Sequence, residues 1–177
     1  MGSYSNFPIK IHGIARYNYQ ISTQQLQKTI VHTIYQLNQE THDLKMLTKS
    51  SPANCELNFE FGIAEQDAFN FLDKEESERF FKSLEDALNE PLRVLDFFCA
   101  TRYHTITPDG KRKPLKFDYA LLRFAFQRRT MELFIVHERG TQRIPLEDLA
   151  IFLTNRINNE LKQRELKTLF LKHMHAL

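Results

Sequence analysis

The chain has no tryptophan, few glycines and almost no cysteine. Its 177 residues include 5 Gly and 2 Cys. Glycine tolerates positive φ and close approach to a ligand, so its scarcity disfavours the glycine-rich loops that cradle phosphate groups. Two cysteines, Cys55 and Cys99, do not make a disulfide framework, and both are expected to be reduced thiols.

Long apolar runs and catalytic motifs are also missing. No uncharged run approaches the roughly 20 apolar residues that a membrane helix needs, and no charged-then-apolar leader is seen. We therefore expect a soluble, cytoplasmic protein without a membrane partner. The Walker loop, the dinucleotide glycine fingerprint, the Gly-x-Ser-x-Gly elbow, His-Glu-x-x-His and paired cysteines are all absent. The commonest enzyme classes are disfavoured, no cofactor or metal is expected, and no catalytic residue is assigned.

Apolar residues, by contrast, are plentiful. A chain of this length that is 42% hydrophobic can bury a substantial core but is short for two independent ones. We therefore expect residues 1–177 to form one domain.

Apolar and polar residues alternate, as in strands, in six segments: 9–19, 57–63, 68–72, 92–106, 115–128 and 131–139. The segments 57–63 and 68–72 are expected to form a hairpin. In 115–128 the apolar phase switches, which predicts either a bulge near 120–122 or a strand covered on both faces.

Three helices are expected between and after these strands. A Ser-x-x-Gln capping box starts a helix over 23–40, and Asp73 caps a second helix. Pro145 opens a third, which runs to the end of the chain with a break near 162–165. The polar stretch 41–54 is expected to be a loop.

The resulting order is βα-ββ-α-βββ-α. It predicts an α+β fold in which an antiparallel sheet of about five or six strands carries helices mainly on one face. The apolar faces of these elements predict the core residues Phe59, Phe61, Phe80, Leu84, Phe97, Phe124, Leu133, Ile135, Leu149 and Leu153. The helix that follows Asp73 has an apolar stripe of Phe80, Phe81, Leu84, Ala87 and Leu88.

The last segment, 166–177, carries an apolar stripe of its own: Leu166, Leu169, Phe170 and Met174. We expect a helix that pairs with a second copy in a homodimer, or failing that folds back over its own sheet. On a helix, His173 and His175 would point in different directions, so a shared metal is not expected.

Charge is unevenly distributed along the chain. Residues 56–90 hold 3 basic and 11 acidic residues, a net charge of −8, whereas 91–145 hold 11 and 5, a net charge of +6. Pairing the last three strands gathers a basic cluster at one end of the sheet: Arg102, His104, Lys111, Arg112, Lys113, Lys116, Arg139 and Arg143. Arg128 and Arg129 fall at the opposite end.

Aromatic residues interleave with this cluster, namely Tyr103, Phe117 and Tyr119. Arginine forks suit phosphate and aromatic faces suit bases, so the cluster has the components of a polyanion site. The alternative is a solvated hairpin tip whose charges keep the sheet edge soluble, partly neutralised by Asp109, Asp118 and Glu138. The sequence lacks an RNP-type strand, a zinc finger and a long basic helix.

Other catalytic or metal combinations fit the spacing poorly. Cys99 and His104 are five residues apart on one strand and point to opposite faces, so Cys99 is expected to be a core thiol. His137, flanked by Glu138 and Arg139, is a candidate acid or base, although nothing in the spacing requires it. Four spaced carboxylates, which carry no calcium-loop motif, could approach a cation: Glu56, Glu60, Asp96 and Asp118.

Two functions remain open. The first is a non-enzymatic binding or regulatory module that contacts a macromolecule, nucleic acid among the candidates, through the basic cluster. The second is an enzyme that acts on an anionic or phosphorylated substrate with His104 or His137 and with Arg102 and Arg139. A pocket containing those four side chains favours the enzyme, and an open basic surface favours the binding module.

Overall fold

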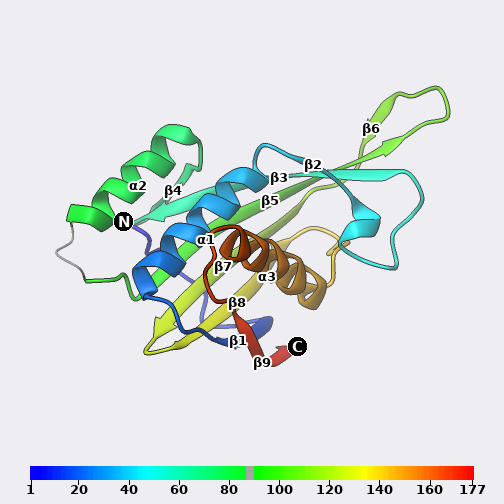
Figure 1. Cartoon of the computed structure of the whole chain (residues 1–177). Helices are drawn as coiled ribbons and strands as arrows, with labels where there is room; N and C mark the ends of the chain where they lie inside the picture. The colour runs from blue at the N-terminus through cyan, green and yellow to red at the C-terminus, as the bar shows by residue number, and fades with distance from the viewer. Residues whose placement is uncertain (87–89) are drawn as a thin grey trace.

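The computed structural model describes residues 1–86 and 90–177, and these ranges form an α+β fold with three α-helices and a nine-stranded antiparallel sheet (Figure 1). The helices are α1 (Thr23–Leu37), α2 (Lys74–Asp86) and α3 (Leu146–Gln163). The strands are β1 (Gly13–Asn18), β2 (Thr41–Asp43), β3 (Cys55–Glu65), β4 (Ala68–Phe71), β5 (Val94–Ile106), β6 (Arg112–Pro114), β7 (Asp118–Gln127), β8 (Thr130–Arg139) and β9 (Phe170–Ala176).

The strands lie in the order β2-β3-β5-β7-β8-β1-β9, with β4 added to β3 and β6 to β5. The predicted element order is recovered when β2, β6 and β9 are set aside, so the prediction of five or six strands was too low. Within the described residues, no helix is long and apolar enough to span a membrane.

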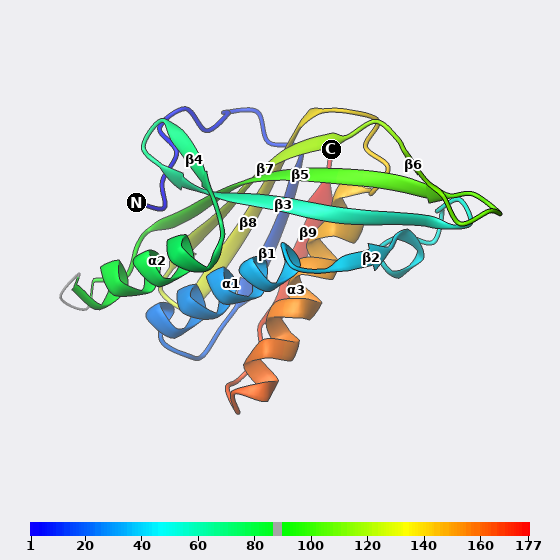
Figure 2. The ribbon, with the colours of Figure 1, turned by 90° about the horizontal axis from the view of Figure 1, so that it is seen from above.

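The helices lie on one side of the sheet (Figure 2). Among the described residues no helix lies on the other side, and the N-terminal segment, residues 4–12, runs along it (Figure 2). We call this side the open face. Successive residues of a strand point to opposite sides, so β3, β5, β7 and β8 each supply side chains to both the core and the open face.

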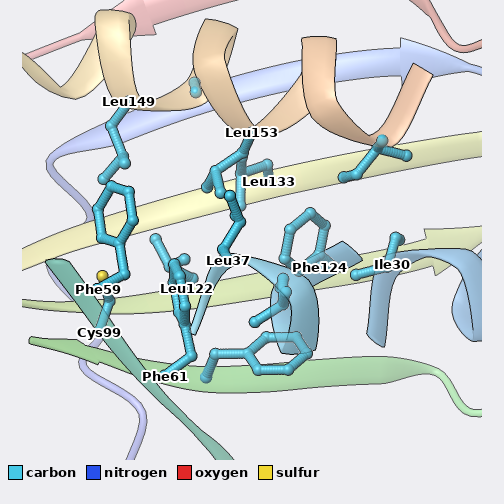
Figure 3. Close-up of a cluster of buried hydrophobic side chains, with 14 of the residues drawn as sticks. Ile30, Leu37, Phe59, Phe61, Cys99, Leu122, Phe124, Leu133, Leu149 and Leu153 are labelled. Carbon is cyan, nitrogen blue, oxygen red and sulfur yellow. The ribbon is translucent and has the colours of Figure 1, made fainter. Parts of the chain in front are cut away.

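The core lies between the sheet and the helices, where residues of α1 and α3 meet those of the central strands (Figure 3). All ten predicted core residues are buried, with at most 5% of each residue exposed. In α2, Phe80 and Leu84 are buried as expected, and Phe81 packs against the core. Ala87 and Leu88 lie outside the described residues.

Polar capping defines where two of the helices begin. The Ser22 hydroxyl accepts a 3.1 Å hydrogen bond from the Gln25 amide, and an Asp73 carboxylate oxygen accepts one of 2.9 Å from the Glu76 amide. Such side chains satisfy amide groups that the first helical turn leaves without partners. The predicted starts of α1 and α2 are therefore confirmed.

Two local predictions were wrong near the start of the chain. The first strand begins at Gly13 and not at Ile9, whose side chain is fully exposed. The preceding residues follow the open face instead of continuing in β1. The 41–54 loop contains β2 and a short 3-10 helix (Leu44–Met46), because the edge of β3 offers hydrogen-bonding partners to residues 41–43.

The C-terminal segment is a strand, so the predicted helix over 166–177 was wrong. α3 ends at Gln163, within the predicted break, and Glu165 turns the chain with a φ of 58°. β9 then pairs with β1, whose other edge pairs with β8. Leu166, Leu169 and Met174 still pack against the core, whereas Phe170 is 65% exposed.

Candidate functional site

Five aromatic rings form a row across the open face. Neighbouring ring centroids lie 4.7 to 6.3 Å apart in the order Tyr4, Phe69, Phe98, Tyr119 and Phe117. Phe98 and Tyr119 stack with 27° between their planes, and Phe117 meets Tyr119 edge-on. The five side chains are half-buried, so each stays partly accessible. We call this set the aromatic row.

A glycine makes the row possible at the point where β4 folds over β3. Gly62 lies opposite Phe98 of β5 and Phe71 of β4. A Cβ added to Gly62 would lie 3.1 Å from the Asn70 carbonyl oxygen and 3.2 Å from the Phe69 Cβ. The missing side chain therefore lets β4 approach closely enough for Phe69 to contact Phe98.

The N-terminal segment is fixed to the open face by a buried ion pair. Asp96 is fully buried, and its two carboxylate oxygens each accept a 2.7 Å hydrogen bond from Arg123. The same carboxylate accepts the Tyr4 amide at 2.7 Å, and the Arg123 guanidinium lies 4.1 Å from the ring centroid of Phe7. These contacts place the Tyr4 ring against Phe69.

A β-bulge places two neighbouring charges on the open face. Tyr119 pairs with Arg139 and Ala120 pairs with His137, which leaves Glu138 as an extra residue in β8. Because the bulge interrupts the alternation of side chains, Glu138 and Arg139 both line a cavity on the open face. Both are exposed, and neither has an ion-pair partner among the described residues.

Two cavities meet at Tyr119 and Arg139, which line both of them. The larger, of about 780 Å³, also has Lys116, Phe117 and Gly140 in its wall. The smaller, of about 430 Å³, lies toward Phe98 and includes Tyr4, Phe69, Leu121 and Glu138. We call the two together the Tyr119 groove.

Asp118 fixes the position of the chain after β8, which includes Gly140 in the wall of the larger cavity. Its carboxylate accepts hydrogen bonds from the Gln142 amide at 2.7 Å and the Arg143 amide at 2.9 Å. Gly140 has a φ of 112°, and an added Cβ would overlap the Phe117 carbonyl oxygen and the Asp118 carboxylate. Glycine is therefore required for the chain to turn so close to β7.

Some members of the predicted basic cluster form ion pairs with carboxylates, and others do not. Arg102 binds Glu60 at 2.6 Å, Arg112 binds Glu56 at 2.8 Å, and Lys111 lies 3.5 Å from Asp109. Lys111 and Arg112 belong to the β5–β6 hairpin, whose tip projects from the body (Figure 1). Lys113, Lys116 and Arg139 have no ion-pair partner among the described residues.

Arg143 lies on the other side of the sheet from Arg139. Its guanidinium lies 5.6 Å from the ring centroid of Tyr103, a core residue on the helix-covered side. The Tyr103 hydroxyl donates to Asp118 at 2.6 Å, and burial together with this bond raises the pKa of Tyr103. Of the three aromatic residues that interleave with the cluster, only Phe117 and Tyr119 belong to the aromatic row.

The geometry also disfavours a cysteine nucleophile. Cys99 is buried in the core, and burial raises the pKa of its thiol to about 12, which keeps it protonated at neutral pH. His104 lies on the same strand, where it pairs with Glu56 of β3 and Pro114 of β6. Because His104 is five residues from Cys99, its side chain faces the opposite side of the sheet, as strand alternation predicts. Neither His104 nor His137 lines the Tyr119 groove.

The four spaced carboxylates are separately engaged. Glu56, Glu60 and Asp96 bind arginines, and Asp118 accepts hydrogen bonds from the 142–143 amides and Tyr103. In residues 1–86 and 90–177 no three His, Cys, Asp or Glu side chains gather in a way that could hold a metal ion.

The two C-terminal histidines are arranged differently from the prediction. On β9, residues two apart share a face, so the His173 and His175 rings stack with 24° between their planes and with centroids 6.5 Å apart. The prediction that they point in different directions was wrong because it assumed a helix.

Tyr4, Phe69, Phe98 and Glu138 were missed as site residues. Phe98 and Tyr119 occupy strand positions whose neighbours point into the core, and large aromatic residues at such positions were the available signal. Comparison with protein-family models, curated proteins and solved structures found no match for this chain.

Proposed function

We propose that the protein is a nucleic-acid-binding module and that the Tyr119 groove is its binding site. The observation that carries the proposal is the pairing of half-exposed aromatic rings with two cations, Lys116 and Arg139, that have no ion-pair partner among the described residues. Aromatic faces stack on bases, and lysine and arginine neutralise phosphates.

Only part of the basic cluster is expected to contact nucleic acid. The carboxylates beside Arg102 and Arg112 reduce the positive field there, and these two side chains are already oriented by hydrogen bonds. Lys116 and Arg139, in contrast, are free to contact a phosphate next to the aromatic rings. The expected binding site is therefore the groove and not the hairpin tip.

An open groove also favours binding over the enzyme alternative. The enzyme hypothesis needs His104 or His137 in a pocket with Arg102 and Arg139, and neither histidine lines the groove. The His137 Nε2 is buried and has no hydrogen-bond partner in residues 1–86 and 90–177, although it lies 3.7 Å from the Asp118 carboxylate. His137 pairs with the core residue Ala120, so its side chain lies on the helix-covered side of the sheet and does not face a substrate on the open face.

Charge-matched variants test the proposal. Fluorescence anisotropy of a labelled, mixed-sequence single strand is measured between about 50 and 200 mM salt. Lys116→Ala with Arg139→Ala is expected to weaken binding and to reduce the slope of log affinity against log salt by about 1.4, since each phosphate contact on a single strand contributes about 0.7.

The control is Arg128→Ala with Arg129→Ala, which removes the same charge from the β7–β8 turn at the other end of the strands. It is expected to leave the slope nearly unchanged. Equal losses for the two double variants would indicate nonspecific attraction and contradict the proposed site. An absence of binding by the unaltered protein at the lowest salt would contradict the function itself.

A further inference from the structure

The bulge in β8 gives the smaller cavity a chemical asymmetry. Arg139 is shared by both cavities, whereas Glu138 lines only the smaller one. Without the extra residue in β8, strand alternation would direct these neighbours to opposite sides of the sheet. The strand pairing therefore places a cation, Arg139, between the two cavities and an anion, Glu138, in the smaller one.

The walls of the smaller cavity suit a flat ring with polar edges. Phe69, Phe98 and Tyr119 provide aromatic surface, and Glu138 is the only acidic side chain in this wall among the described residues. Glu138 makes no hydrogen bond or ion pair with another described residue, so its carboxylate is available as an acceptor. A ligand here must bring a hydrogen-bond donor on the edge of an aromatic ring.

Resting on the proposed function, we propose that the smaller cavity reads one unpaired base of a single strand and selects bases that carry an exocyclic amino group. The base lies against the aromatic walls with its amino group donating to Glu138. The neighbouring nucleotide occupies the larger cavity beside Phe117, and Arg139 contacts the phosphate between them.

The selection follows from base chemistry. Cytosine presents its N4 amino group and adenine its N6 amino group as donors, whereas thymine presents the O4 acceptor at the equivalent position. A carboxylate accepts from the amino group and repels carbonyl oxygens, and the single ring donor of thymine, N3–H, lies between two of these, O2 and O4. In a duplex the faces of each base are covered by the stacked neighbours, so the base must be unpaired and unstacked to lie against the aromatic walls while its amino group reaches Glu138.

The test compares short homopolymers of deoxycytidine and of thymidine, whose bases are of similar size. The unaltered protein is expected to bind the cytosine strand roughly fivefold to tenfold more tightly. This ratio corresponds to the lower end of the free-energy difference that a single base contact provides. Glu138→Gln is expected to bring this ratio below about twofold, because the amide can donate to O4 as well as accept.

Glu132→Gln is the matched control. Glu132 lies on the same strand and its carboxylate pairs with Arg16, away from the groove, so the ratio is expected to remain that of the unaltered protein. Equal binding of both homopolymers by the unaltered protein, or an unchanged ratio in Glu138→Gln, would overturn base selection while leaving nucleic-acid binding intact. If neither homopolymer binds and mixed-sequence strands do not bind either, the proposed function itself is contradicted.

Discussion

Replacing Phe97 by alanine is expected to lower the free energy of unfolding by about 3–5 kcal/mol, the range for a buried phenylalanine. Phe97 is fully buried on the helix-covered side of β5, and its ring meets Phe124 edge-on with centroids 5.9 Å apart. Truncation removes this apolar contact and leaves a cavity that the central strands cannot easily close.

The next residue provides the control. Phe98 lies on the open face, where its ring is half-buried between Phe69 and Tyr119. Phe98→Ala is expected to cost less stability in the same urea titration, because part of its surface is already in water. A larger loss for Phe98 than for Phe97 would reverse the assignment of core and open face.

Replacing Asp96 by alanine is expected to cost about 3 kcal/mol, the lower limit for breaking a buried ion pair by removing one partner. The change leaves Arg123 without its bidentate partner and the Tyr4 amide without an acceptor. The lower limit applies because 26% of the Arg123 side chain is exposed, so water can solvate it in part.

Hydrogen exchange locates this effect. In Asp96→Ala the amides of Tyr4 and Ser5 are expected to lose protection, since within the described part of the chain the Tyr4 amide bonds only to the Asp96 carboxylate and the Ser5 amide only to the Gln66 carbonyl. Glu132→Ala, which frees the half-exposed Arg16, is expected to change stability by no more than about 1 kcal/mol. Protection of the Tyr4 and Ser5 amides that survives in Asp96→Ala would show that the ion pair does not anchor this part of the chain.

The sequence was sufficient for the core because burial depends on local periodicity. Phe59 and Phe61 alternate along β3, and Leu149 and Leu153 repeat along α3, so their positions follow from the geometry of single elements. The hairpin formed by β7 and β8 followed in the same way, because a short turn fixes its register.

β9 could not be predicted on these grounds. The stripe of Leu166, Leu169 and Met174 is compatible with a helix, and the strand forms because the free edge of β1 supplies backbone partners from the other end of the chain. β2 depends in the same way on the free edge of β3. Tertiary hydrogen bonding thus overrode the local pattern twice.

The candidate site was predicted only in part. Lys116, Phe117, Tyr119 and Arg139 were expected near one another because two hairpins connect their strands. Their ion-pairing could not be read from the sequence, and neither could the contribution of Tyr4 and Phe69, which come from distant segments. Glu138, the extra residue of the bulge, could not be predicted. The apolar pattern of β7 changes phase near residues 120–122, but this change does not show that the extra residue lies in the neighbouring strand, β8.

The most direct measurement of the central claim is an amide chemical-shift map of the protein titrated with a short single strand. We expect the largest shifts at the groove, in Lys116, Phe117, Tyr119, Glu138 and Arg139, with little change along α1 and α3 on the other side of the sheet. Shifts concentrated on those helices, or no shifts at any strand concentration, would contradict the assignment of the Tyr119 groove as a nucleic-acid site.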